Sequence, residues 1–307
     1  MESCSRREFI AMGLAGAAVM TLPALGNPAK EQPVFTISLA EWSLHRALYA
    51  GDLDHLDFPK AARETCGIDA VEYVSVFFAK KDEDDYLAEL NQHCRDHGVK
   101  SLLIMVDNEG AIGARDEGER LKTVENHRKW LHAAKVLGCH SIRVNAQSEG
   151  TYEEQQKLAA DGLARLVAHA EPMGLNVIVE NHGGLSSNGA WLAGVMKLVD
   201  NPRCGTLPDF GNFCLDWAKA EDPAMWYDRY KGVAEMMPYA KAVSAKSREF
   251  NDKGEEVQTD FHKMLRIVTD AGYHAHLGIE WEGDGMSEHD GIVATKKLLE
   301  KVREELV

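Results

Sequence analysis

From residue 33 onward, short runs rich in β-forming residues alternate eight times with longer segments of helical apolar spacing. The predicted strands are Val34–Leu39, Ala70–Val74, Lys100–Val106, Ser141–Asn145, Asn176–Glu180, Cys204–Asp209, Ala240–Lys246 and His276–Trp281. The predicted helices are Phe58–Thr65, Asp84–His97, Glu117–Leu137, Tyr152–Met173, Ala190–Val199, Met225–Met236, Phe261–Ala271 and Gly291–Glu305. Such alternation indicates parallel strands joined by right-handed crossovers. Eight units within about 275 residues predict an α/β fold with a single (β/α)8 TIM barrel.

The main alternative is a doubly wound open sheet, which also alternates strands and helices. In that fold a G-x-G-x-x-G turn commonly follows the first strand and cradles a dinucleotide. No such turn follows the first predicted strand here, and no internal repeat, low-complexity run or Pro/Ser-rich linker divides residues 33–307. We therefore expect one barrel domain over residues 33–307.

Residues 1–26 have the pattern of an export signal. Arg6 and Arg7 precede a weakly apolar run from Ile10 to Leu25, and small residues flank a possible cleavage point after Gly26. Paired arginines in this position are typical of a twin-arginine-type signal peptide. The run of about 16 residues is short for a membrane span, although an uncleaved N-terminal anchor is the alternative. We expect a periplasmic or exported protein with no transmembrane domain in the mature chain.

The charge balance narrows the class of partner. The chain has 34 Lys and Arg against 49 Asp and Glu, a net charge of −15, and 45% of its residues are hydrophobic. This apolar fraction excludes a disordered chain, and the negative charge opposes nucleic-acid binding. The composition favours an enzyme or a small-ligand binder, and it leaves a homo-oligomer open.

Reactive side chains follow the predicted strands, where the chemistry of a (β/α)8 barrel takes place. In chain order they are Glu41 with Trp42, Glu72, Asp107, Asn145, Glu180 with Asn181 and His182, Asp209, Lys246 and Glu280. Since the carboxyl ends of all eight strands open on one face of a barrel, these side chains are expected to line a common mouth.

Glu180 and Glu280 form the most informative pair. Each ends a run of apolar β-forming residues, and strands five and eight lie nearly opposite each other across the ring. With Asp209 between them, the carboxylates could hold one divalent cation. Glu180 and Glu280 could also act as base and acid, removing a proton beside a sugar carbonyl and returning it elsewhere. The alternative is that all three acids are solvated loop residues.

Four further residues are candidates for binding substrate: His182, Asn212, Lys246 and Trp42. His182 could ligate a metal, hydrogen-bond a sugar hydroxyl or be an ordinary loop residue. Trp42, with Phe77 and Phe78, could form an apolar wall against a sugar face, although barrel packing would explain these aromatic residues equally well.

Four segments carry a resemblance to a known family: Val177-Ile-Val-Glu-Asn-His-Gly, Leu207-Pro-Asp-Phe-Gly-Asn, Ala242-Val-Ser-Ala-Lys and Gly278-Ile-Glu-Trp-Glu-Gly. From about Pro33 onward the chain resembles the xylose isomerase-like TIM barrel superfamily, which includes the sugar phosphate isomerase/epimerase family and relatives of D-tagatose 3-epimerase and hydroxypyruvate isomerase. The resemblance implies a metal held by Glu180, Asp209 and Glu280. It also implies a histidine ligand on strand seven, where this chain has Ser244.

A serine hydroxyl is a weaker ligand for a transition metal than an imidazole. The resemblance still implies one divalent cation (Mn, Mg, Co or Zn), with Lys246 as an alternative source of positive charge. The predicted function is an exported sugar isomerase or epimerase that works through a metal-stabilised ene-diolate. The alternatives are a keto-sugar lyase, dehydratase or hydrolase on the same barrel, and a non-catalytic carbohydrate-binding barrel. Export favours a free or glycosidic sugar over a phosphorylated one.

Overall fold

The computed structural model describes residues 33–79 and 84–306, and the signal peptide predicted over residues 1–26 lies outside them. The strands in the described residues are β1 Thr36–Ala40, β2 Ala70–Val74, β3 Lys100–Met105, β4 Ser141–Val144, β5 Asn176–Glu180, β6 Cys204–Leu207, β7 Val243–Ser247 and β8 His276–Trp281. All pairings are parallel, in the order β6-β5-β4-β3-β2-β1-β8-β7. The predicted (β/α)8 barrel is confirmed.

The ring closes between β6 and β7 by a looser connection than the other seven. Two isolated parallel bridges, Thr206 with Ala240 and Asp209 with Ser244, stand where the other strand pairs have a continuous ladder. Ser244 donates its backbone N–H to the Pro208 carbonyl over 2.9 Å and accepts the N–H of Phe210 over 3.1 Å. Because Pro208 has no N–H to donate, a regular ladder cannot continue through it. β6 therefore ends at Leu207 and not at Asp209 as predicted.

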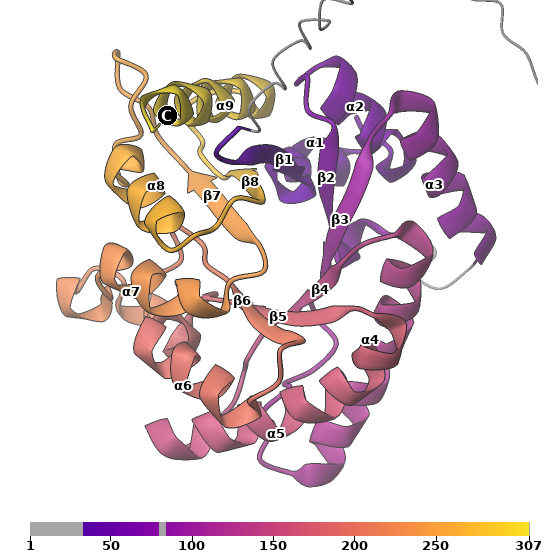
Figure 1. Cartoon of the computed structure of the whole chain (residues 1–307), viewed down its shortest axis with the longest axis vertical. Helices are drawn as coiled ribbons and strands as arrows, with labels where there is room; N and C mark the ends of the chain where they lie inside the picture. Colours follow the sequence, from indigo (N-terminus) through magenta and orange to yellow (C-terminus); the bar gives the residue numbers. More distant parts are fainter. Residues whose placement is uncertain (1–32, 80–83, 307) are drawn as a thin grey trace, which may run out of the picture. The chain divides into compact units, whose positions relative to one another are not determined.

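The helices lie on the outside of the strands (Figure 1). In the described residues they are α1 His45–Ala50, α2 Phe58–Glu64, α3 Asp84–His97, α4 Glu117–Leu137, α5 Tyr152–Ala170, α6 Gly189–Val199, α7 Arg229–Met236, α8 Phe261–Asp270 and α9 Glu288–Glu305. None of them combines the length and the apolar character needed to cross a membrane. α1 was not predicted from the sequence, because six residues are too few to show a clear apolar period.

Local signals explain where the long helices begin and end. Asp116 caps α4 by accepting the backbone N–H of Glu119 over 2.9 Å, and Gly138 ends this helix with φ of 74°. Thr151 and Glu154 form a reciprocal capping box at the start of α5. These caps satisfy backbone groups that have no partner inside the helix. The helix ends are thus determined locally, and they determine where each following strand begins.

The barrel interior contains a small apolar cluster, separate from the large core between strands and helices. Its buried members are Ala40, Val74, Leu103, Met105, Ile178, Leu207 and Ala242. Several further buried side chains on the strands are polar or charged, among them Ser38, Glu72, Arg143, Glu180, Ser244 and Glu280. Burying so many ionisable groups is costly unless they are paired. The arrangement of these buried polar groups therefore indicates where a functional site lies.

Candidate active site at the barrel mouth

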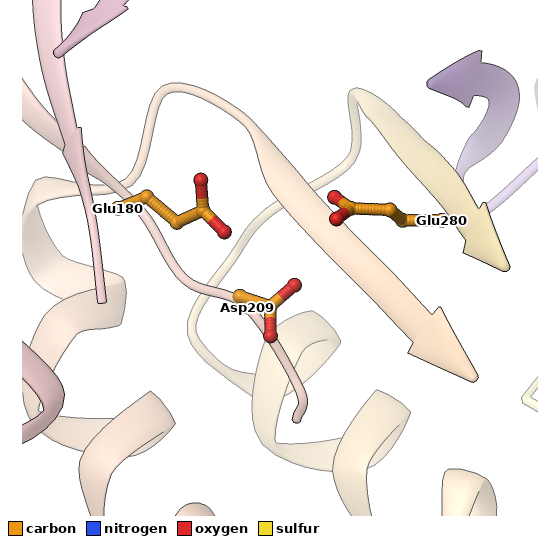
Figure 2. A group of neighbouring side chains, drawn as sticks. All are labelled: Glu180, Asp209 and Glu280. Atoms are coloured by element: carbon orange, nitrogen blue, oxygen red, sulfur yellow. The ribbon is translucent and has the colours of Figure 1, made fainter. Parts of the chain in front are cut away.

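Three carboxylates from three different strand ends of the ring converge on one point. Glu180 ends β5, Asp209 follows β6, and Glu280 lies in β8. One oxygen from each lies within 4.8 Å of the others, and the three side chains point toward one another in Figure 2. All three are buried, with exposed fractions of 1%, 0% and 5%. The structure therefore brings the three predicted acids together and removes them from bulk water.

Asp209 is held by its own loop and by β7. Its Oδ1 accepts the backbone N–H groups of Gly211 over 2.8 Å and Asn212 over 2.7 Å. Its Oδ2 accepts the Ser244 hydroxyl over 2.6 Å, and the same hydroxyl lies 3.1 Å from Glu280 Oε2. Ser244, where the resemblance implied a histidine, thus ties two of the three acids together through hydrogen bonds.

Glu180 is paired with a cation that the sequence analysis did not select. Arg143, on β4, places Nε 2.8 Å from Glu180 Oε2 and Nη1 2.8 Å from Asp107. Asn212 donates its side-chain N–H to Glu180 Oε1 over 2.9 Å. An arginine in the otherwise apolar run Ser-Ile-Arg-Val, two residues before Asn145, was the available signal. Because side chains two residues apart lie on the same face of a strand, Arg143 shares its face with Asn145, which was expected at the mouth.

Glu280 is paired with Lys246 from β7. Lys246 Nζ lies 2.9 Å from Glu280 Oε1 and 3.2 Å from both Glu282 Oε2 and Asn212 Oδ1. Glu282 also accepts hydrogen bonds from Arg248 over 2.6 Å and from Trp42 Nε1 over 3.0 Å. Glu282 was not among the residues predicted from the sequence, although its spacing of two from Glu280 puts both on one face of an extended strand.

Burial and neighbouring charges shift the protonation of this cluster. Burial raises the pKa of Glu180 and of Asp209 to about 7 against the opposing effect of their cationic neighbours. Burial alone would lower the pKa of Lys246, but the carboxylates of Glu280 and Asp209 raise it above its usual value. Burial would raise the pKa of Glu282, yet Lys246 and Arg248 lower it to about 2. The site thus contains two carboxyl groups whose pKa lies near neutral pH, next to side chains that stay charged at that pH.

The donor atoms of the three acids fit a hard divalent cation. The cluster offers carboxylate oxygens only, with the hydroxyl of Ser244 beside them, and oxygen ligands suit Mg²⁺, Mn²⁺ or Ca²⁺ better than softer metals. Glu180 Oε2 forms an ion pair with Arg143 Nε over 2.8 Å but without hydrogen-bond geometry. A cation held here would therefore share this oxygen with the guanidinium.

Two adjoining cavities lie at the barrel mouth, and Glu280 lines the smaller of them. The smaller, of about 100 Å³, is lined by Trp42, Asp107, Arg143, His182, Lys246, Glu280 and Glu282, with Val74 and Met105. The larger, of about 300 Å³, shares Trp42, Asp107 and His182 with it and continues to Tyr49, Glu109 and His127. Of the four residues predicted to bind substrate, Trp42, His182 and Lys246 line a cavity. Asn212 does not line these cavities, and its side chain contacts Glu180 and Lys246 instead. Phe77 packs near Trp42, whereas Phe78 belongs to the main core.

His127 lies on α4 and has two kinds of neighbour. It is buried, and its Nδ1 lies 2.7 Å from the carbonyl of Thr123. The structure also places it in the wall of the larger cavity. Its helical context gave no indication of this second position.

The fold and the site together define the class of protein. It is a TIM barrel whose mouth, at the carboxyl ends of the strands, holds a polar site of converging buried acids. The model of the xylose isomerase-like TIM barrel family matches residues 59–303. The chain belongs to this family, as its sequence motifs indicated. A comparison with curated protein sequences finds no match.

Solved structures share the fold at low sequence identity. A sugar phosphate isomerase/epimerase from Parabacteroides distasonis is 14% identical with a TM-score of 0.65, covering 91% of this chain and 98% of its own. An L-ribulose 3-epimerase is 14% identical with a TM-score of 0.67 over 88% and 95% of the chains. A xylose isomerase-like TIM barrel protein from Mycobacterium smegmatis, in complex with magnesium, is 16% identical with a TM-score of 0.64 over 89% and 98%.

Proposed function

We propose that the protein is a sugar isomerase or epimerase, which moves a proton at a carbon next to a carbonyl group. The observation that carries this proposal is the placement of Glu180 and Glu280 on opposite sides of one buried acidic cluster, next to a cavity (Figure 2). Two carboxyl groups that face one another can serve as base on one side of a sugar and as acid on the other.

Each carboxyl group has an environment suited to its part. With its pKa near 7, Glu180 can both accept and release a proton at neutral pH, which is the condition for effective general acid–base catalysis. The Lys246 ammonium compensates the charge of Glu280. One carboxylate takes the proton from the carbon, leaving an ene-diolate. A proton returned to the neighbouring carbon, together with transfer of the hydroxyl proton from one oxygen to the other, gives isomerisation. A proton returned to the other face of the same carbon gives epimerisation.

Glu180, Asp209 and Glu280 would hold one divalent cation, with magnesium or manganese the best match to their oxygen donors. When bound, such a cation supplies Lewis acidity that favours charge on the substrate oxygens. Around it, Arg143 and Lys246 line the cavity and are placed to hold sugar oxygens. The magnesium complex of the Mycobacterium smegmatis protein supports the proposal of a metal here.

We further propose that the substrate is a free or glycosidic carbohydrate met outside the cytoplasm, after export directed by residues 1–26. The names of the neighbours, a sugar phosphate isomerase/epimerase and an L-ribulose 3-epimerase, support a carbohydrate substrate. The twin arginines at Arg6 and Arg7 support export. Phosphorylated sugars are mainly cytoplasmic. The proposed substrate of an exported protein is therefore not phosphorylated, although the name of the first neighbour includes a sugar phosphate.

The proposal is tested by exchange with solvent deuterium. Candidate keto- and aldo-sugars are incubated with the protein in D₂O with Mg²⁺ or Mn²⁺, and proton NMR follows loss of the signal next to the carbonyl. We expect exchange and a product of unchanged chemical composition. Glu180→Gln and Glu280→Gln should each slow the exchange at least about 100-fold, while the exposed Glu125→Gln should not.

Other results would point to the alternatives. Loss of water or of an aglycone would identify a dehydratase, lyase or hydrolase using the same acids. Sugar binding without exchange, unaffected by Glu180→Gln, would refute catalysis and leave a carbohydrate-binding barrel.

A further inference from the structure

A third cavity, of about 280 Å³, adjoins the two at the barrel mouth. It shares Asn145, Gln147 and His182 with the larger of them, and His182 lines all three. None of the three acids lines this third cavity, so it needs an explanation separate from the proton transfer.

The lining of the third cavity differs in chemistry from the reaction centre. Its walls are Asn145, Ala146, Gln147, Ser148, Gln155, His182, Gly183, Gly184, Leu185, Ser186 and Trp217. This lining contains no acid, lysine or arginine, whereas the lining of the smaller cavity at the barrel mouth contains three acids and two cations. Neutral amides and hydroxyls next to an aromatic ring suit an uncharged polyhydroxylated ligand, and they do not suit a phosphate.

Trp217 provides the aromatic face. It is 51% exposed, lies in the short 3-10 helix Trp217–Lys219, and stands at 84° to the ring of Trp226, with centroids 5.6 Å apart. Trp226 is itself held by a hydrogen bond of 2.8 Å from its Nε1 to the Ala220 carbonyl. The contact with Trp226 restricts the rotation of the exposed Trp217 indole. Binding a ligand on a side chain that is already restricted costs little additional conformational entropy.

The turn after β5 allows this approach. Gly183 has φ of 92°, and a Cβ built on it would lie 3.1 Å from Trp217 Nε1. Gly184 has φ of 59°, and a Cβ there would meet nothing within 4 Å. Both backbone conformations favour glycine. Within the described part of the chain, neither the ring of His182 nor the indole N–H of Trp217 is used in a hydrogen bond, so both are available to a ligand.

We propose that this cavity is a second sugar-binding subsite, which makes the substrate a disaccharide or a comparable glycoside. The inference rests on the proposed function. The reacting sugar occupies the two cavities at the barrel mouth, and its glycosidic partner extends past Asn145 and His182 onto the face of Trp217. Trp217 is a specificity-determining residue that takes no part in proton transfer.

The test compares substrates of two lengths on one reaction. Deuterium exchange is measured for a keto-hexose and for a disaccharide that carries the same keto-hexose unit, with wild type, Trp217→Ala, Trp217→Phe and Tyr152→Ala. Tyr152 is an exposed aromatic residue that lines none of the three cavities. We expect at least tenfold higher kcat/KM for the disaccharide in wild type. Trp217→Ala should remove this advantage by raising KM, Trp217→Phe should retain part of it, and Tyr152→Ala should change nothing.

Equal kcat/KM for both substrates in wild type, or an equal loss for both in Trp217→Ala, would overturn the subsite while leaving the proposed function intact. Unmodified glucose disaccharides provide a test that does not depend on turnover. Their binding should quench tryptophan fluorescence in wild type and clearly less in Trp217→Ala, in which only Trp42 of the other two cavities can still respond. If this quenching occurs without exchange on any sugar, the subsite stands and the proposed function fails. Absence of quenching together with absence of exchange refutes both.

Discussion

Replacing Lys246 with methionine removes one of the two cations that balance the acidic cluster. Lys246 is 3% exposed, and its Nζ contacts Glu280 over 2.9 Å and Glu282 over 3.2 Å. Methionine keeps most of the volume without the charge. Removing one partner of a buried ion pair leaves the other charge uncompensated, which typically costs about 3–5 kcal/mol. We expect Lys246→Met to lower the free energy of unfolding by this amount at pH 8.

The loss should depend on pH in a defined direction. The pKa values of Glu180 and Asp209 are already raised to about 7, above those of the unfolded chain, and losing Lys246 raises them further. A carboxyl group whose pKa is raised in the fold stabilises it most at low pH, and that contribution is lost as the pH rises toward the folded-state pKa. Variant and wild type lose this contribution in parallel up to about pH 7, and above it only the variant continues to lose it. The difference between them should therefore stay nearly constant from pH 5.5 to about pH 6.5 and grow from there to pH 8, by up to about 1.4 kcal/mol per pH unit for each group.

Urea unfolding followed by circular dichroism at several pH values measures this difference, with a chelator present. The control is Lys219→Met, which breaks the exposed pair between Lys219 and Asp216 and should cost far less, because solvent screens exposed ion pairs. Adding Mn²⁺ should then restore part of the stability of Lys246→Met, about 2.7 kcal/mol at 100 times its Kd. A loss no larger than that of Lys219→Met, or one independent of pH, would refute the view that Lys246 balances buried carboxylates.

Two further predictions concern the metal and a buried histidine. Protein purified without chelator should contain about one magnesium or manganese ion per chain by plasma mass spectrometry, since three converging carboxylates favour a hard cation. Asp209→Asn should lose this ion, and Glu125→Gln should keep it. A wild-type protein that stays metal-free after incubation with excess cation would contradict the metal site. Burial lowers the pKa of His55 to about 3, so the stability due to its neutral ring is complete above the unfolded-chain pKa near 6.5 and is lost as the pH falls. His55→Gln should thus lose about 2 kcal/mol less than wild type between pH 7 and pH 5 in urea unfolding. Parallel losses would show that the fold does not lower the pKa of His55.

The sequence by itself determined the barrel and its three acids. Alternating apolar runs and glycine-ended helices are local patterns, and eight of them leave few topologies. Glu180 and Glu280 were found because each ends an apolar strand, and in a parallel barrel all strand ends meet on one face. Their convergence with Asp209 within 4.8 Å follows from that topology. The family assignment followed from the same segments.

Only the tertiary structure decided which partners these acids have. Strand periodicity assigns a face to Arg143 or Glu282, but it does not say which residue of another strand lies opposite. The pairing of Arg143 with Glu180 joins β4 to β5, and the contact of Trp217 with the turn at Gly183 joins segments 34 residues apart. Such contacts depend on the register and curvature of the closed sheet, which no local pattern encodes. For the same reason the pKa values near 7, which arise from burial in that sheet, could be known only from the fold.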